Sequence, residues 1–193
     1  MVAMNPPFAF RRQRGVSMIE VLVTIVILGL GIMGLIGLQS RMQISELESY
    51  QRAQALILLQ DMANRIATNR GAAGDYVTGS EAPLGTGHTC TVSGTLQQRD
   101  SCAWSEALLG SAEKAGNTNV GTLIGGRGCV EDLGNDEYLI TVTWQSMVPG
   151  APPPAGVACG RNLYDAPSGS GSACTADRCR RAVTTLVRIG SLT

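Results

Sequence analysis

Glu20 is an acid at the start of a long apolar run, where the desolvation of a carboxylate is unfavourable unless the charge is solvated or paired. Residues 21–40 contain no charged side chain, and three arginines lie just upstream, among residues 11–14. Carrying a carboxylate to the middle of a bilayer costs a few kcal/mol. Glu20 therefore either stays at the membrane interface, where the positive end of the helix dipole favours it, or it pairs with a cation.

Cleavage after Gly15 would create such a cation, because it would leave a new α-amino group on Val16. Glu20 is the fifth residue counted from Val16, so within one helix the two groups are too close for good pairing geometry. Neighbouring subunits staggered along an axis would bring them together. At about 4 Å and an effective dielectric near 20, the pair would gain roughly 4 kcal/mol, which offsets the desolvation of the carboxylate.

Six cysteines form the second set of reactive residues, and all of them follow the apolar run. An even number of cysteines on one side of a membrane segment predicts disulfides in an oxidising compartment. A zinc site is the alternative, but no pair has CxxC spacing and His88 is the only histidine. Fifteen pairings are open to six cysteines; we favour Cys159 with Cys174 or Cys179, and then Cys90 with Cys102. The full set is Cys90, Cys102, Cys129, Cys159, Cys174 and Cys179.

No other group of residues predicts catalysis, a metal site or a cofactor site. His88 would have to serve a catalytic triad, yet no serine lies in a GxSxG elbow. The glycines of IGGRG lack the lysine and the spacing of a phosphate-binding loop. The four acids among residues 131–137 do not follow the DxDxDG order of a calcium loop, so we interpret them as a solvated turn. The sequence therefore predicts a protein that is not an enzyme.

The apolar run is long enough to cross a membrane, because twenty helical residues rise about 30 Å. It is longer than the apolar core of a cleavable secretory signal, and no small-x-small site follows it. By the positive-inside rule the arginine-rich leader stays in the cytoplasm, and the residues after Ser40 are exported. The formal net charge is +0 and aromatic residues make up 4%, so composition predicts no nucleic-acid partner.

A single long helix is predicted from Ser17 to Arg70, because residues 8–82 contain no proline and residues 38–70 no glycine. Arg70 followed by Gly71 is typical of a helix end. The second half of the helix carries an apolar stripe at helical spacing, which we expect to pack on the protein's own globular part. The stripe comprises Leu47, Gln51, Ala55, Leu58, Leu59, Met62 and Ile66.

Residues 72–193 are richer in turn-forming residues and predict short elements. Residues 101–114 predict a helix with Trp104 and Leu108 facing inward, and residues 122–130 predict a hairpin with Gly125 and Gly126 at its turn. EYLITVTWQ and RRAVTTLVRIG alternate and predict two strands, with a cysteine-containing loop, residues 149–179, between them. Short strands favour an antiparallel sheet whose apolar face is covered by the second half of the long helix.

The N-terminal stretch, a basic leader followed by Gly15 and VSMIEVLVTIVILG, closely resembles the class III signal of type IV pilins and type II secretion pseudopilins. The resemblance implies that a membrane peptidase cuts after Gly15 and methylates the new N-terminus at Val16, where most members have phenylalanine. It also implies that Glu20 guides subunit docking, and that the helix melts near Gly29 in the assembled filament.

The same resemblance implies an α+β, type IV pilin-like fold, in which a long N-terminal helix packs on a small, disulfide-stapled antiparallel sheet. Residues 1–15 would be the cleaved cytoplasmic leader and residues 16–40 the transmembrane and assembly half of the helix. Residues 41–71 would be its periplasmic half, and residues 72–193 the globular domain.

In function, the resemblance implies a minor pilin that helps to start assembly of a type IV pilus and needs no cofactor or metal. Its partners would be prepilin peptidase, other minor pilins, the major pilin and a large tip adhesin, with the bacterial inner membrane holding it before assembly. A minor pseudopilin of a type II secretion system has the same architecture. The alternative from another class is a single-span anchored periplasmic binding protein that never polymerises.

Overall fold

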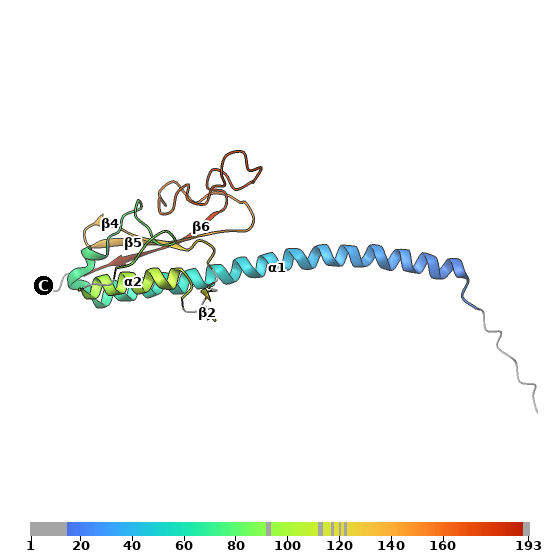
Figure 1. Cartoon of the computed structure of the whole chain (residues 1–193), viewed down its shortest axis with the longest axis horizontal. Coiled ribbons are helices and arrows are strands. Elements are labelled where there is room, and N and C mark those ends of the chain that lie inside the picture. The colour runs from blue at the N-terminus through green and yellow to red at the C-terminus, as the bar shows by residue number, and fades with distance from the viewer. Residues whose placement is uncertain are drawn as a thin grey trace, which may run out of the picture. The chain divides into compact units, whose positions relative to one another are not determined.

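A computed structural model describes residues 15–91, 94–111, 114–116, 118–119, 121 and 123–190. The chain divides into two compact units, residues 1–43 and residues 44–193. Helix α1 (Met18–Thr68) runs through the boundary, so its first half belongs to one unit and its second half to the other. Figure 1 colours α1 from blue to green and the later sheet strands from yellow to red.

Helix α1 is continuous over 51 residues. This continuity is expected, because residues 8–82 contain no proline and residues 38–70 contain no glycine. Its second half buries one face, and the buried positions confirm most of the predicted stripe. Leu58 is partly buried, but Leu47 is 50% exposed and its predicted burial is wrong, because the first buried position of the helix is Gln51, one turn later. The buried residues are Gln51, Ala55, Leu59, Met62, Ala63 and Ile66.

The end of α1 differs from the prediction. A 3-10 helix, η1 (Arg70–Tyr76), follows directly after Asn69. Gly71 lies inside η1 and does not have a positive φ, so it is not the left-handed residue that closes many helices. The chain instead tightens into a 3-10 turn, in which the N–H of Ala72 donates to the carbonyl of Asn69 at 3.0 Å.

Four strands form an antiparallel sheet in the order β1-β4-β5-β6. They are β1 (Leu84–Gly85), β4 (Arg127–Gly134), β5 (Glu137–Gln145) and β6 (Arg180–Arg188). The two strands predicted from alternation are β5 and β6, and both are confirmed. A separate two-stranded ribbon pairs β2 (Lys114–Ala115) with β3 (Thr118–Asn119).

The main hairpin of the sheet lies at another turn than the one predicted. Strand β4 pairs with β5 across Asn135 and Asp136, whose φ angles are 55° and 57°. Two successive positive φ angles characterise the two-residue turns that suit twisted antiparallel strands. The hairpin predicted at Gly125 and Gly126 is wrong: a Cβ on Gly126 would lie 2.5 Å from the carbonyl oxygen of Leu108, so this glycine serves a close backbone contact.

Helix α2 (Leu96–Leu108) begins and ends earlier than the predicted range of residues 101–114, of which residues 112–113 lie outside the described part. A capping box fixes its start: the hydroxyl of Thr95 accepts from the N–H of Gln98, and the side chain of Gln98 accepts from the N–H of Thr95. Trp104 and Leu108 are buried, as predicted.

One face of the sheet packs against α2 and the second half of α1 to form the core. Tyr138, Ile140, Val142 and Trp144 of β5 alternate onto this face and are at most 7% exposed. Trp104 joins the layers, because its indole N–H donates to the carbonyl of Leu58 at 2.8 Å.

The loop that joins β5 to β6 covers part of the other face of the sheet. Thr141 and Thr143 of β5 are fully buried beneath it, and the hydroxyls of Thr143 and Tyr164 lie 2.9 Å apart. Arg180 donates to the carbonyls of Val157 and Cys159, both at 2.9 Å. This loop is therefore a packed layer with its own polar contacts.

Three disulfides join Cys90 to Cys102, Cys129 to Cys159 and Cys174 to Cys179. The first pair confirms the prediction. The predicted bond from Cys159 to Cys174 or Cys179 is wrong, because the loop crosses the sheet and brings Cys159 to Cys129 of β4. Cys174 and Cys179, which are separated by only 5 positions in the sequence, bond to each other just before β6.

Candidate processing and assembly site

The bond between Gly15 and Val16 lies just outside the first turn of α1. The carbonyl of Ser17 accepts from the N–H groups of Glu20 and Val21 at 3.0 and 3.3 Å, so helical hydrogen bonding begins at Ser17. Gly15 and Val16 precede it in non-helical conformation, and Val16 is 69% exposed. The Gly15–Val16 bond is therefore exposed and lies outside the helix. The arginines among residues 11–14 lie outside the described residues.

Glu20 sits in the first turn of α1 with its side chain exposed. No cation of the described residues pairs with it, and the next basic residue along the helix is Arg41. The helix dipole favours an acid here, and the hydroxyl of Thr24 in the next turn donates to the carbonyl of Val21 at 2.8 Å. The carboxylate is thus exposed and has no positive partner among the described residues.

The apolar half of α1 exposes its side chains along its whole length. Every residue from 15 to 43 is exposed, including Leu22, Ile25 and Leu28 at 61–63%. Length and hydropathy make α1 able to cross a membrane, and none of the residues in its most apolar window is buried. So much uncovered apolar surface indicates contact with lipid or with other proteins.

Four glycines lie in this apolar half, at Gly29, Gly31, Gly34 and Gly37, and all are helical in the structure. A Cβ added to any of them would meet nothing within 4 Å. No contact inside the chain therefore requires a glycine at these positions. Melting near Gly29 in an assembled filament stays a prediction.

The globular part presents no arrangement of catalytic or metal-binding groups among its described residues. All six cysteines are in disulfides, so none supplies a thiolate for zinc. No three His, Cys, Asp or Glu side chains of the described part gather as metal ligands. His88 lies exposed in a turn, where its N–H donates to the carbonyl of Gly85. Of the acids among residues 131–137, Asp132 and Asp136 lie exposed at the β4–β5 turn, Glu131 is partly buried, and Glu137 pairs with Arg188.

A polar cluster at the end of α1 anchors the helix to the globular part, and sequence analysis missed it. The hydroxyl of Tyr76 donates to Asp100 at 2.6 Å, and Arg65 pairs with the other oxygen of Asp100 at 3.0 Å. Burial raises the pKa of Tyr76 to about 12, and the hydrogen bond to Asp100 acts in the same direction. The three residues come from α1, η1 and α2, so no local spacing links them.

Residues 10–36 match the family model of the prokaryotic N-terminal methylation motif. The match supports a type IV pilin-like protein. It spans the Gly15–Val16 bond, Glu20 and most of the exposed apolar half of α1, all of which are exposed in the structure. No curated protein and no solved structure matches the chain.

Proposed function

We propose that this protein is a minor pilin of a type IV pilus, similar to PilV, that helps to initiate pilus assembly. The observation that carries the proposal is a methylation motif at residues 10–36 placed on a helical half that is exposed throughout, while the other half of the same helix is built into a disulfide-bonded domain. One half is therefore free to join other subunits without unfolding the other.

Processing comes first in this function. Prepilin peptidase cuts the exposed bond after Gly15 and methylates the amine of Val16. The apolar half of α1 holds the protein in the inner membrane, and the domain that follows lies in the periplasm until the subunit enters the surface pilus. Both disulfide-rich composition and the topology of the leader support this order.

Docking relies on Glu20. In the assembling filament, its carboxylate pairs with the methylated amine of Val16 on a neighbouring subunit, since no cation among the described residues pairs with it. Such a pair is worth roughly 4 kcal/mol at about 4 Å and an effective dielectric near 20. The apolar helices of other minor pilins and the major pilin pack around it, and a large adhesin joins at the tip.

Intact mass and N-terminal sequencing of the protein from host membranes test the processing step. We expect the mature chain to start at N-methyl-Val16, and Gly15→Ala to block the cut. A chain that starts at Met1 or Met4 would contradict the proposal and favour an anchored periplasmic binding protein.

Substituting Glu20 tests the docking step. We expect Glu20→Ala to insert in the membrane normally but to lower incorporation into pili at least about tenfold, because the lost pair is worth more than 1.4 kcal/mol. Glu46→Ala, an exposed acid later on the same helix, is the matched control and should assemble normally. Full incorporation of Glu20→Ala would remove docking from the proposal.

A minor pseudopilin of type II secretion is the second candidate, because the methylation motif is shared by both kinds of machine. The glycine-rich block of α1 and the stretches YLITVTWQ and RRAVTTLVRI, which form β5 and β6, resemble the pilin PilV and favour the pilus. A deletion strain separates the two: lost twitching motility indicates a pilus, and exoproteins trapped in the periplasm indicate secretion.

A further inference from the structure

Strand β6 is the last strand of the sheet, so one side of its backbone faces no other strand. The N–H of Ser146 donates to Cys179 at one end of the β5–β6 pair, and that of Ile189 donates to Asp136 at the other, at 2.8 and 2.9 Å. Hydrogen-bonded pairs alternate along antiparallel strands. The odd-numbered residues of β6 therefore bond to β5, and the even-numbered residues direct their N–H and C=O groups outward.

The outward groups in the middle of β6 are unused. No described residue hydrogen-bonds to the backbone of Ala182, Thr184 or Leu186 on that side. Proteins usually protect such an edge by shortness, bulges, prolines or charges. The opposite edge, β1, is protected by its length of 2 residues, whereas β6 pairs over nine residues without a register shift and residues 182–187 carry neither charge nor proline.

A hollow lies on each side of this free edge. On the side of α1, a hollow of about 280 Å³ is lined by residues 45–52 of the helix, Trp144 and Val183. On the side of the β5–β6 loop, a hollow of about 310 Å³ is lined by residues 151–157, Ala182 and Thr184. Successive side chains of a strand point to opposite faces. A strand added to β6 would therefore place its own side chains alternately in the two hollows.

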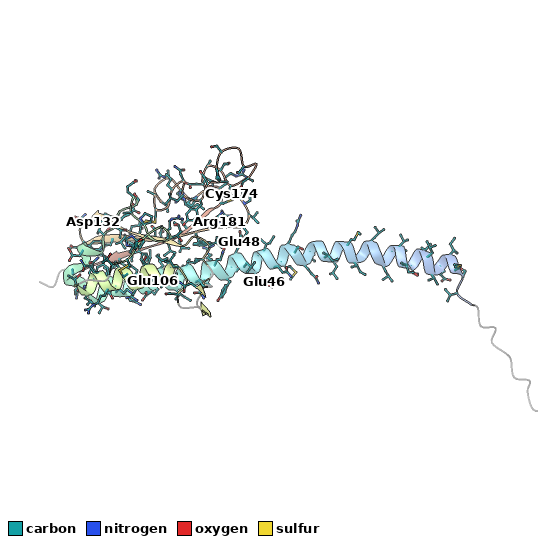
Figure 2. The ribbon with its side chains drawn as sticks, in the orientation of Figure 1. Glu46, Glu48, Glu106, Asp132, Cys174 and Arg181 are labelled. Carbon is teal, nitrogen blue, oxygen red and sulfur yellow. A yellow bond between two sulfur atoms is a disulfide. The ribbon has the colours of Figure 1, made fainter. Side chains whose placement is uncertain are left out.

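The charges at the first hollow, on the side of α1, favour an acidic side chain of a binding partner. Glu48 accepts a hydrogen bond from the hydroxyl of Ser146 and lies 3.9 Å from Arg181 (Figure 2). Arg52 lines the same hollow, is exposed, and forms no ion pair with any described residue. Two guanidinium groups against one carboxylate leave an excess positive charge, which an incoming carboxylate would neutralise.

A second copy of β6 suits this edge less well. The strand begins with Arg180 and Arg181 and ends with Arg188. If two copies paired antiparallel about Thr184, the start of each strand would lie against the end of the other, arginine against arginine. Like charges directly opposite each other destabilise a strand pair.

We propose that the outer edge of β6 is a strand-addition site for an extended segment of another protein, with an acidic residue of that segment meeting Arg52 and Arg181. Main-chain hydrogen bonds to Ala182, Thr184 and Leu186 provide the affinity, and the two hollows and the arginines select the sequence. This contact uses the globular part together with the second half of α1, and it does not depend on the apolar first half of α1 or on its processing.

The test uses the full-length protein in detergent and a fluorescent nine-residue peptide of alternating valine and threonine with one central glutamate. We expect saturable binding by fluorescence anisotropy, and slower hydrogen exchange over residues 180–188 when the peptide is present. Thr184→Pro removes an outward N–H without touching the β5 ladder, so it should weaken binding at least about tenfold. Thr184→Val keeps that N–H and should bind as the wild type does.

Two further comparisons keep the result independent of any folding defect in the proline variant. The same peptide, methylated on alternate backbone nitrogens, should not bind the wild-type protein, because it cannot complete the ladder. Arg52→Glu should weaken the glutamate peptide several-fold and favour its lysine counterpart, whereas Arg99→Glu on α2 should change neither. The proposal would be overturned if the peptide did not bind, or if the methylated peptide bound equally well. It would also be overturned if the protection of β6 increased with protein concentration in the absence of peptide, because that result would assign the edge to a second copy of this chain.

Discussion

The two halves of α1 form one helix yet differ in what surrounds them. Residues 18–43 are the more apolar half, and all of them are exposed; residues 44–68 are the more polar half, and they contain every buried position of the helix. In a folded domain, apolar side chains are normally the buried ones. The reversal indicates that the second half stabilises the protein itself, whereas the apolar surface of the first half is suited to contact with lipid or other proteins.

Two methionines test this comparison with the same chemical change. Met62 is 0% exposed and Met33 is 74% exposed. We expect Met62→Ala to lower the free energy of unfolding of the globular part by about 2–5 kcal/mol, because it leaves a cavity in the core. Met33→Ala should change it by less than about 0.5 kcal/mol.

Chemical unfolding of the full chain in detergent, followed by the near-ultraviolet circular dichroism of Trp104 and Trp144, measures both values. The two tryptophans are buried in the core, so they report on the globular part. Equal destabilisation by the two substitutions would mean that the first half of α1 also supports the folded domain, and the division of the helix would be wrong.

The polar cluster around Tyr76 at the end of α1 makes the free energy of unfolding depend on pH in the alkaline range. The pKa of Tyr76 is about 12 in the folded protein, chiefly because the side chain is buried, and about 10 in an unfolded chain. The unfolded state therefore loses its proton first as the pH rises. Stability is complete below pH 10 and falls between pH 10 and 12, by up to about 2–3 kcal/mol.

Unfolding experiments between pH 9 and 11.5 test this dependence. Tyr76→Phe should be less stable near neutral pH, since Asp100 loses a donor, but its stability should fall less steeply above pH 10. Tyr50→Phe, a tyrosine of α1 that is 45% exposed, should keep the steeper wild-type profile. Parallel profiles for all three proteins would exclude Tyr76 as the source.

The smallest effect on stability is expected from Gly29→Ala in the first half. Nothing lies within 4 Å of the added Cβ, and alanine favours the helix by up to about 1 kcal/mol locally. Unfolding of the globular part should be unchanged. If the helix must melt near Gly29 during assembly, the variant should enter pili less efficiently, and immunoblots of sheared pili would show it; Gly37→Ala is the control. Equal incorporation of both variants would count against melting.

Elements with a strong local signal were predictable from the sequence. The periodicity of α1 and the alternation of β5 and β6 follow from which side chains must face the core, and Cys90–Cys102 is a local bond. The burial predicted for Leu47 is wrong because periodicity identifies a face of the helix, but not the point at which the globular part stops covering that face. The prediction of a turn at Gly125–Gly126 is wrong because the turn lies at Asn135 and Asp136, two residue types that also tolerate positive φ.

Features that depend on the path of the chain were not predictable. The bond between Cys129 and Cys159 requires the long loop to cross the sheet, which no spacing encodes. The contact of Tyr76 with Asp100 joins two elements 24 residues apart. The residues predicted for processing and docking are the opposite case: Gly15, Val16 and Glu20 are predicted from a contiguous motif, and the structure adds that all three are exposed and that no described cation pairs with Glu20.

The disulfides have one more consequence, which concerns the order in which the chain is made. Each bond joins cysteines that are neighbours in the sequence: first to second, third to fourth, fifth to sixth. A chain that enters an oxidising compartment from its N-terminal side presents each cysteine with its native partner before the next pair arrives. Oxidation in order of emergence therefore yields the native pattern, and no cysteine has to exchange partners afterwards.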